Sequence, residues 1–113
     1  VPVDGSHWLS MREVVDSLSL KGHEVVVVAP EVNSQMKPSK NFIMKMFPVP
    51  FTQEEHDENF QAFSKEITDE GSLLERAFRF YQRTKKTFEI YLATCTHLLY
   101  NEELVRYLEE SKF

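Results

Sequence analysis

Apolar residues change their spacing near residue 51, and this change divides the chain into two parts. Before residue 51 they fall in short runs such as 25–29, bounded by glycine, proline or polar residues. After it they recur every three or four residues, which is the spacing of an amphipathic helix. The pattern predicts a sheet-forming part in residues 1–51 and a helical part in residues 52–113, both belonging to one domain.

The sheet-forming part is predicted to fold as strand, helix, strand and strand. Residues 1–3 look like the end of a strand that is already under way, residues 24–29 like a strand buried on both faces, and residues 42–47 like a weaker strand. The intervening helix should end at Lys21 and Gly22, since glycine is the usual residue just past a helix end. This order predicts a right-handed βαβ unit and the start of a Rossmann-like α/β domain.

Two start positions fit the sequence of that first helix equally well. Ser10 and Glu13 can form a capping box, with Leu9 and Val14 as its hydrophobic staple, while a start at Ser6 fits as well. The apolar residues expected on the buried face of this helix are Met11, Val15 and Leu18.

Three more helices are predicted after residue 51. Capping boxes mark the first two starts, at Thr52 with Glu55 and at Ser72 with Glu75, and Asn101 can cap the third. The first has an apolar face that includes Ile67. We expect most of the aromatic residues in this part to lie in the core. Any that line a cleft would suit an apolar ligand. These residues are Phe60, Phe63, Phe78, Phe80, Tyr81, Phe88 and Tyr91.

Charge and glycine content exclude several classes of function. The chain has 13 basic and 18 acidic residues, a net charge of −5, which argues against a nucleic-acid partner. Four of the acidic residues lie in residues 53–58. The three glycines are too far apart to form a phosphate-binding loop, and no apolar run approaches the length of a membrane span.

His7 is the candidate catalytic residue. It is expected in a turn between the first strand and the helix, at the edge where open α/β sheets bind their ligands. The positive end of a helix dipole favours a neutral imidazole, which is the form that a general base requires. Alternatively, His7 only fills the turn beside Trp8. Asp4 could orient it but is more typical of a turn, and Ser6 is more typical of a helix cap than of a hydrogen-bond donor or a nucleophile.

The other titratable groups have simpler interpretations. His56 lies among four acidic residues, where a metal site is conceivable, but no metal-binding spacing is present and a solvated helix face is expected. His23 is interpreted as structural. Cys95 and His97 point in different directions on a helix, so joint chemistry is not expected. No metal or cofactor site is predicted.

Four blocks of sequence resemble the start of the mature vertebrate UDP-glucuronosyltransferases, most closely those of the family 1 type. In chain order they are VPVDGSHWLSM (1–11), KGHEVVVVAPE (21–31), FPVPFT (47–52) and CTHLLYNEEL (95–104). They extend over nearly the whole chain and keep their order, and the Asp-Gly-Ser-His-Trp block is the most specific. Residues 32–46 and 53–94 are less diagnostic and are expected to include the variable acceptor-binding region.

The resemblance implies an incomplete N-terminal, acceptor-side part of a GT-B glycosyltransferase. In this family the N-terminal domain binds a small lipophilic acceptor and the C-terminal domain binds UDP-glucuronic acid as donor substrate. The catalytic histidine falls on His7, which would deprotonate the acceptor hydroxyl before glucuronic acid is transferred with inversion. The aspartate that pairs with this histidine in the family has no counterpart among the matching residues, and Asp4 is not assigned that role.

The family's donor-binding signature, membrane anchor and signal peptide also lie outside the match. We therefore expect a fragment that is inactive alone and whose full-length form lies in the endoplasmic reticulum membrane, on the lumenal side. Association with the membrane would occur only through the missing segments, and homo- or hetero-oligomers are compatible with the family. The alternative is a truncated, non-catalytic module that binds apolar small molecules or full-length subunits. A purely structural helical protein would leave the strand at 24–29 unexplained.

Overall fold

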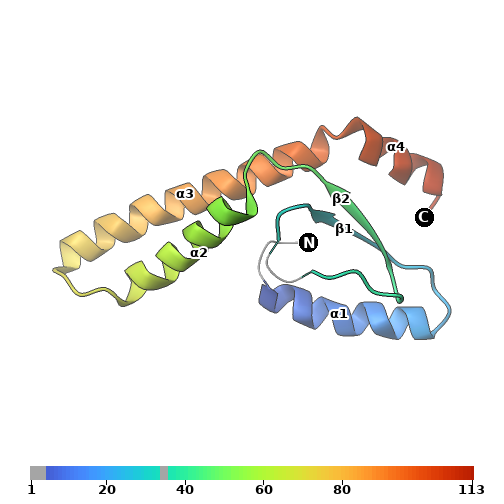
Figure 1. Ribbon diagram of the computed structural model, residues 1–113, viewed down its shortest axis with the longest axis horizontal. Helices are drawn as coiled ribbons and strands as arrows, with labels where there is room; N and C mark the ends of the chain where they lie inside the picture. Colours follow the sequence, from blue (N-terminus) through green and yellow to red (C-terminus); the bar gives the residue numbers. More distant parts are fainter. Residues whose placement is uncertain (1–4, 34–35) are drawn as a thin grey trace.

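The computed structural model describes residues 5–33 and 36–113 and has mixed α/β architecture (Figure 1). The predicted strand at residues 1–3 lies outside the described residues. Along the chain the elements are α1 (Gly5–Leu20), β1 (Val26–Pro30), β2 (Ile43–Phe47), α2 (Gln53–Thr68), α3 (Leu73–Leu99) and α4 (Glu102–Ser111).

β1 and β2 pair in parallel, with Val27 opposite Met44 and Val28 opposite Lys45. The residues described between them, 31–33 and 36–42, form no helix, as the sequence predicts. The two strands lie between α1 on one side and α4 on the other (Figure 1). These elements confirm an α/β fold with strands before residue 51 and helices after residue 52.

The core lies between α1 and the sheet. Its buried members come from α1, from β1 and from the segment that leads into β2: Trp8, Val15, Val27, Ala29, Met36 and Phe42. The expectation that β1 is buried on both faces is only half right, because Val26 and Val28 on its other face are half-buried. That face is partly covered by α4, where the ring of Tyr107 lies 4.2 Å from Lys45 Nζ.

α1 begins at Gly5, so the earlier of the two predicted starts is the correct one. The capping box at Ser10 is wrong, because the Ser10 hydroxyl lies inside the helix and donates to the Ser6 carbonyl at 3.5 Å. Leu9 and Val14 are exposed and form no buried staple. Of the predicted buried face only Val15 is buried, while Met11 and Leu18 are exposed. Trp8, seven residues before Val15, takes their place.

The end of α1 is as predicted. Gly22 has a φ of +88°, a conformation that favours glycine. Its N–H donates to the Ser19 carbonyl at 3.0 Å, and the His23 N–H donates to the Leu18 carbonyl at 3.1 Å. This pair of bonds satisfies carbonyls that the helix end would otherwise leave unpaired.

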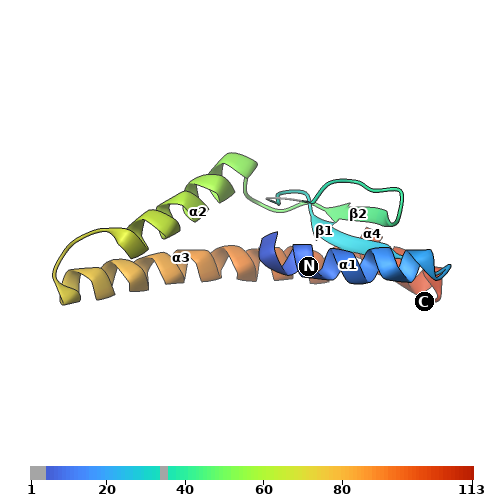
Figure 2. The ribbon, with the colours of Figure 1, turned by 90° about the horizontal axis from the view of Figure 1, so that it is seen from below.

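α2 and α3 form a helical hairpin that projects away from the sheet (Figure 2). Both predicted capping boxes are confirmed, at Thr52 with Glu55 and at Ser72 with Glu75. The Asn101 side chain accepts a hydrogen bond from the Leu104 N–H, which confirms the predicted cap of α4. The projecting hairpin gives a radius of gyration of 17.2 Å, against about 13 Å for a compact chain of this length.

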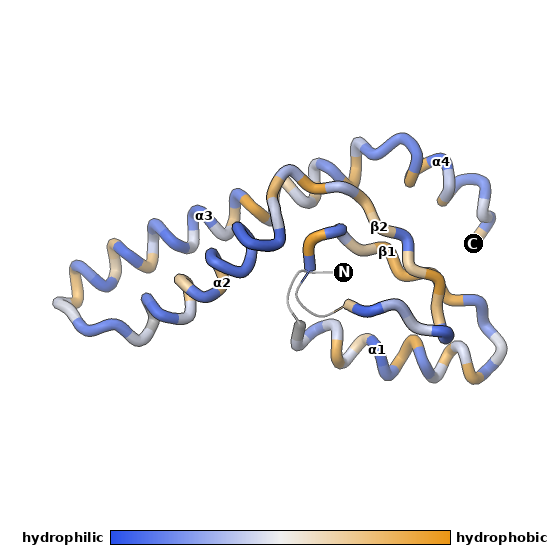
Figure 3. Tube along the Cα trace, viewed as in Figure 1, coloured by the Kyte–Doolittle hydropathy of each residue, from blue (hydrophilic) through white to orange (hydrophobic). Residues whose placement is uncertain are grey.

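The aromatic residues of the hairpin are not core, contrary to expectation. The structure describes every residue of α3, and none of them is buried. In α2, Phe60 is 62% exposed and Phe63 is half-buried. Hydrophobic and hydrophilic residues intermix along both helices, whereas β1 and β2 are more uniformly hydrophobic (Figure 3). The exposed aromatic residues of α3 are Phe78, Phe80, Tyr81, Phe88 and Tyr91.

None of the helices in the described part of the chain is both long and apolar enough to span a membrane.

Candidate functional site

The carboxyl ends of β1 and β2, the first turn of α1 and the first turn of α2 all lie at one end of the sheet (Figures 1 and 2). Parallel strands share such an edge, and open α/β sheets bind ligands beside it. The candidate site is therefore this carboxyl edge.

His7 lies in the first turn of α1 and is exposed, as a base that must reach a substrate would be. Trp8, the next residue, is only 3% exposed, and its ring contacts that of Phe42 edge to face. Because successive helical residues point about 100° apart, the buried indole holds the turn while His7 points elsewhere. Asp4 lies outside the described residues, so its predicted role stays untested, and Ser6 is an exposed helical residue.

The residues that follow β1 are held by the side chain of Asn33. Its Nδ2 donates to the Pro30 carbonyl at 3.1 Å, and its Oδ1 accepts from the Met36 N–H at 2.8 Å. Met36 in turn lies in the core. This part of the carboxyl edge is thus fixed to the end of β1.

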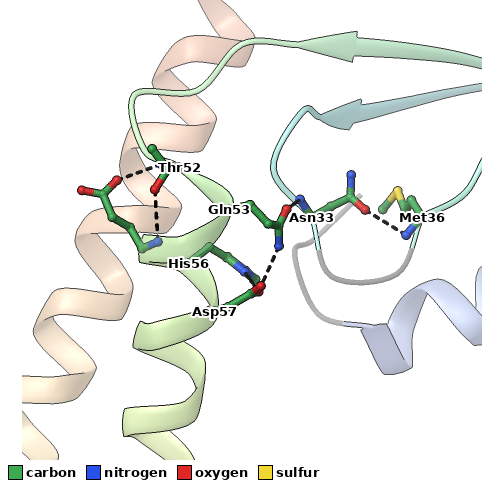
Figure 4. A network of polar contacts seen from close by, with 7 residues as sticks. Asn33, Met36, Thr52, Gln53, His56 and Asp57 are labelled. Atoms are coloured by element: carbon green, nitrogen blue, oxygen red, sulfur yellow. Dashed lines mark hydrogen bonds and ion pairs between the residues drawn. The ribbon is translucent and has the colours of Figure 1, made fainter.

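A second set of polar contacts joins this segment to α2 (Figure 4). Gln53 accepts a hydrogen bond from the Asn33 N–H at 3.2 Å and donates through Nε2 to Asp57 Oδ1 at 2.9 Å. The same carboxylate oxygen lies 3.1 Å from Nδ1 of His56. The hydrogen bonds from His56 and Gln53 hold the pKa of the Asp57 carboxyl below its usual range.

The prediction of a solvated helix face at His56 is wrong, because His56 is only 7% exposed. It shares the inner face of α2 with Asn59, Phe63 and Glu66, at steps of three, four and three residues. This face packs against α3, so burial follows the position on the helix rather than the acidic composition of the segment. The helical spacing of these residues shows that they share one face of α2, but it does not show that α3 covers that face.

Arg83 of α3 makes several polar contacts with the inner face of α2. Its guanidinium donates to both oxygens of Glu66, at 3.2 and 2.6 Å, and to Asn59 Oδ1 at 3.3 Å. The hydrogen bonds from Arg83 lower the pKa of Glu66, and those to Glu66 raise the pKa of Arg83. Arg83 also borders an open polar hollow beside α3, away from the sheet. These contacts hold the hairpin together and place no group at the carboxyl edge.

The remaining candidates are exposed side chains. His23 lies beyond the opposite end of α1 from His7, and Cys95 and His97 lie on α3. Within residues 5–33 and 36–113, no three His, Cys, Asp or Glu side chains gather as a metal ion would require.

Comparisons with known proteins assign the chain to a family. The sequence profile described as UDP-glucoronosyl and UDP-glucosyl transferase matches residues 1–113. UDP-glucuronosyltransferase 1A1 of Homo sapiens is 39% identical over 113 residues, and UDP-glucuronosyltransferase 1A6 of the same species is 42% identical over 113 residues. UDP-glucuronosyltransferase 1A1 of Rattus norvegicus is 40% identical over the same length.

Each of these matches covers 100% of this chain but 21% of the relative, so the chain spans about a fifth of the length of these curated relatives. No solved structure matches it. The profile match extends from the first residue to the last and includes the turn that carries His7. The chain therefore belongs to the UDP-glucoronosyl and UDP-glucosyl transferase family.

Proposed function

We propose that these residues form part of the acceptor-binding half of a glucuronosyltransferase. The reaction joins a hydroxyl group of a small lipophilic acceptor to glucuronic acid supplied by UDP-glucuronate. The family match and the similarity to named UDP-glucuronosyltransferases support the reaction class. The observation that carries the site is the exposed His7 in the first turn of α1, beside the carboxyl edge of the parallel strands.

In this proposal His7 is the general base. A ring nitrogen accepts the proton of the acceptor hydroxyl, and the oxygen uses the freed electron pair to bond to the anomeric carbon. The bond from that carbon to UDP breaks on the opposite side, so UDP leaves with the electron pair and the configuration inverts. Trp8 contributes by fixing the turn, because it is buried against Phe42.

The test is His7→Ala and His7→Gln in the full-length transferase that contains these residues. Loss of a general base lowers kcat by about 10²–10⁴-fold. The KM for UDP-glucuronate should stay unchanged, because the donor is expected to bind outside these residues. His23→Ala, at the other end of α1, is the matched control and should keep wild-type turnover. Wild-type turnover in both His7 variants would remove His7 from the mechanism.

The wider setting is proposed on the same family membership. The full-length protein would lie at the endoplasmic reticulum membrane with this part in the lumen, attached through segments outside these residues. It can associate with further copies of itself or with related subunits. Protease protection of the full-length protein in intact microsomes, lost when detergent is added, tests the lumenal placement.

A second candidate function is a non-catalytic module that binds apolar small molecules or full-length subunits. The apolar residues exposed on α3, including Tyr81, Phe88 and Leu92, favour it. The coding sequence on both sides of these residues separates the two candidates. Continuation into a donor-binding domain supports the transferase, and a stop codon directly after residue 113 supports the module.

A further inference from the structure

Gln53 connects two parts of the carboxyl edge, the segment that follows β1 and the first turn of α2. Its Oε1 accepts the backbone N–H of Asn33, which follows β1, and its Nε2 donates to Asp57 on α2 (Figure 4). Gln53 is the first residue of α2, so the bond to Asn33 joins α2 to the segment after β1, and the bond to Asp57 one turn along the same helix holds the amide in the orientation that the first bond needs. An amide is suited to this role because it carries both groups in a fixed plane.

Both partners of Gln53 are themselves held in place. Asn33 is bonded to Pro30 and Met36, so its position is fixed relative to the sheet and the core. Asp57 is bonded to the buried His56, so the carboxylate moves with α2. The Gln53 amide therefore sets the spacing between two units that are each internally fixed.

We propose that Gln53 is a positioning residue for the acceptor site. It sets the position of α2 relative to the segment after β1, and with it the width of the acceptor site beside the turn that carries His7. This inference rests on the proposed function, because it places the acceptor at the carboxyl edge. Gln53 takes no part in proton transfer, so it acts on acceptor binding and leaves the chemical step unchanged.

The hydrogen bond between Gln53 and Asp57 can be tested by exchanging the amide and the carboxylate between the two positions. In Gln53→Glu two carboxylates face each other and the donor to residue 57 is lost. In the double variant Gln53→Glu with Asp57→Asn, the new asparagine can donate to the new glutamate and still accept from His56 Nδ1. The glutamate keeps an oxygen for the Asn33 N–H. All three contacts are thus restored with donor and acceptor reversed.

The experiment measures kcat and KM for one small and one large phenolic acceptor in the full-length transferase. Gln53→Met and Gln53→Glu are compared with the double variant and with Gln61→Met, a matched control at an exposed glutamine on α2. Loss of these hydrogen bonds should change acceptor KM by about threefold to tenfold, which corresponds to about 0.6–1.4 kcal/mol in total. The change should differ between the two acceptors, while kcat and the KM for UDP-glucuronate stay within about twofold.

The double variant should bring acceptor KM back to within about twofold of wild type. Unchanged acceptor KM in both single variants would overturn the proposal, and so would a loss of kcat that the double variant does not restore. If Gln53→Met fails to fold, the Gln53→Glu and double-variant pair decides the question alone. An active His7→Ala enzyme would contradict the proposed general base, and it would leave the KM effect of Gln53 as a separate result.

Discussion

The indole of Trp8 meets the ring of Phe42 edge to face, with centroids 5.6 Å apart and ring planes at 83°. The contact joins the first turn of α1 to the residue that precedes β2. Both side chains are buried, at 3% and 7% exposure. Trp8 directly follows His7, so this contact ties the helical turn that carries the candidate base to the core.

Replacement of Phe42 by alanine should lower the free energy of unfolding by about 3–5 kcal/mol, because it leaves a cavity against Trp8. Denaturant unfolding of the full-length transferase measures this. Leu20→Ala, at a side chain that is 88% exposed, is the control and should change the stability little. Equal effects of the two substitutions would contradict the proposed core.

Ser72→Ala should destabilise the start of α3 by about 1 kcal/mol, because the hydroxyl that accepts the Glu75 N–H is lost. Amide hydrogen exchange in the first turn of α3 should accelerate accordingly. Ser64→Ala is the matched control, since the Ser64 hydroxyl only donates back to the Phe60 carbonyl inside α2. The prediction would be contradicted if Ser64→Ala accelerated exchange in α3, or if Ser72→Ala left the exchange rate there unchanged.

The hairpin should lose stability in acid. Arg83 lowers the folded-state pKa of Glu66 below its ordinary 4.5, so the unfolded chain takes up the proton first as the pH falls. The contribution of the pair is complete above about pH 4.5 and is lost as the pH falls through the lower, folded-state pKa. Glu66→Gln should flatten the decline of unfolding free energy between pH 5 and pH 3. Glu109→Gln removes the same charge and is the control. If it flattened the pH dependence as much as Glu66→Gln does, the effect could not be assigned to the Glu66–Arg83 pair.

Local signals predicted local structure well. The capping boxes at Ser72 and Thr52 and the glycine end of α1 each depend on residues within five positions of one another, and all three are confirmed. The capping box predicted at Ser10 fails because α1 already begins at Gly5, so the Ser10 hydroxyl lies inside a formed helix. The position of the first turn, rather than the motif, decides whether such a serine caps.

The candidate site was predictable only in part. His7 is singled out because the sequence predicts a strand before it and a helix around it; the helix is confirmed, the strand lies outside the described residues, and the catalytic role of His7 stays a prediction. The burial of His56 could not be predicted, since it depends on α3 packing against one face of α2. Asn59, on the same face as His56, reaches Thr87 of α3, 28 residues away. Contacts at that separation depend on how the chain closes its loops, which neither composition nor periodicity specifies.

α3 contains no buried residue, and this has a consequence for the cooperativity of unfolding. α3 has 27 residues and is about 40 Å long, but none of its residues is buried. It should therefore contribute little to the free energy of unfolding of the sheet. The core around Trp8 and Ala29 contains no residue of α2 or α3, so opening of the hairpin should leave this core intact. The chain should therefore behave as two foldons of unequal stability, with the helical hairpin opening first and the sheet with α1 persisting to stronger denaturing conditions.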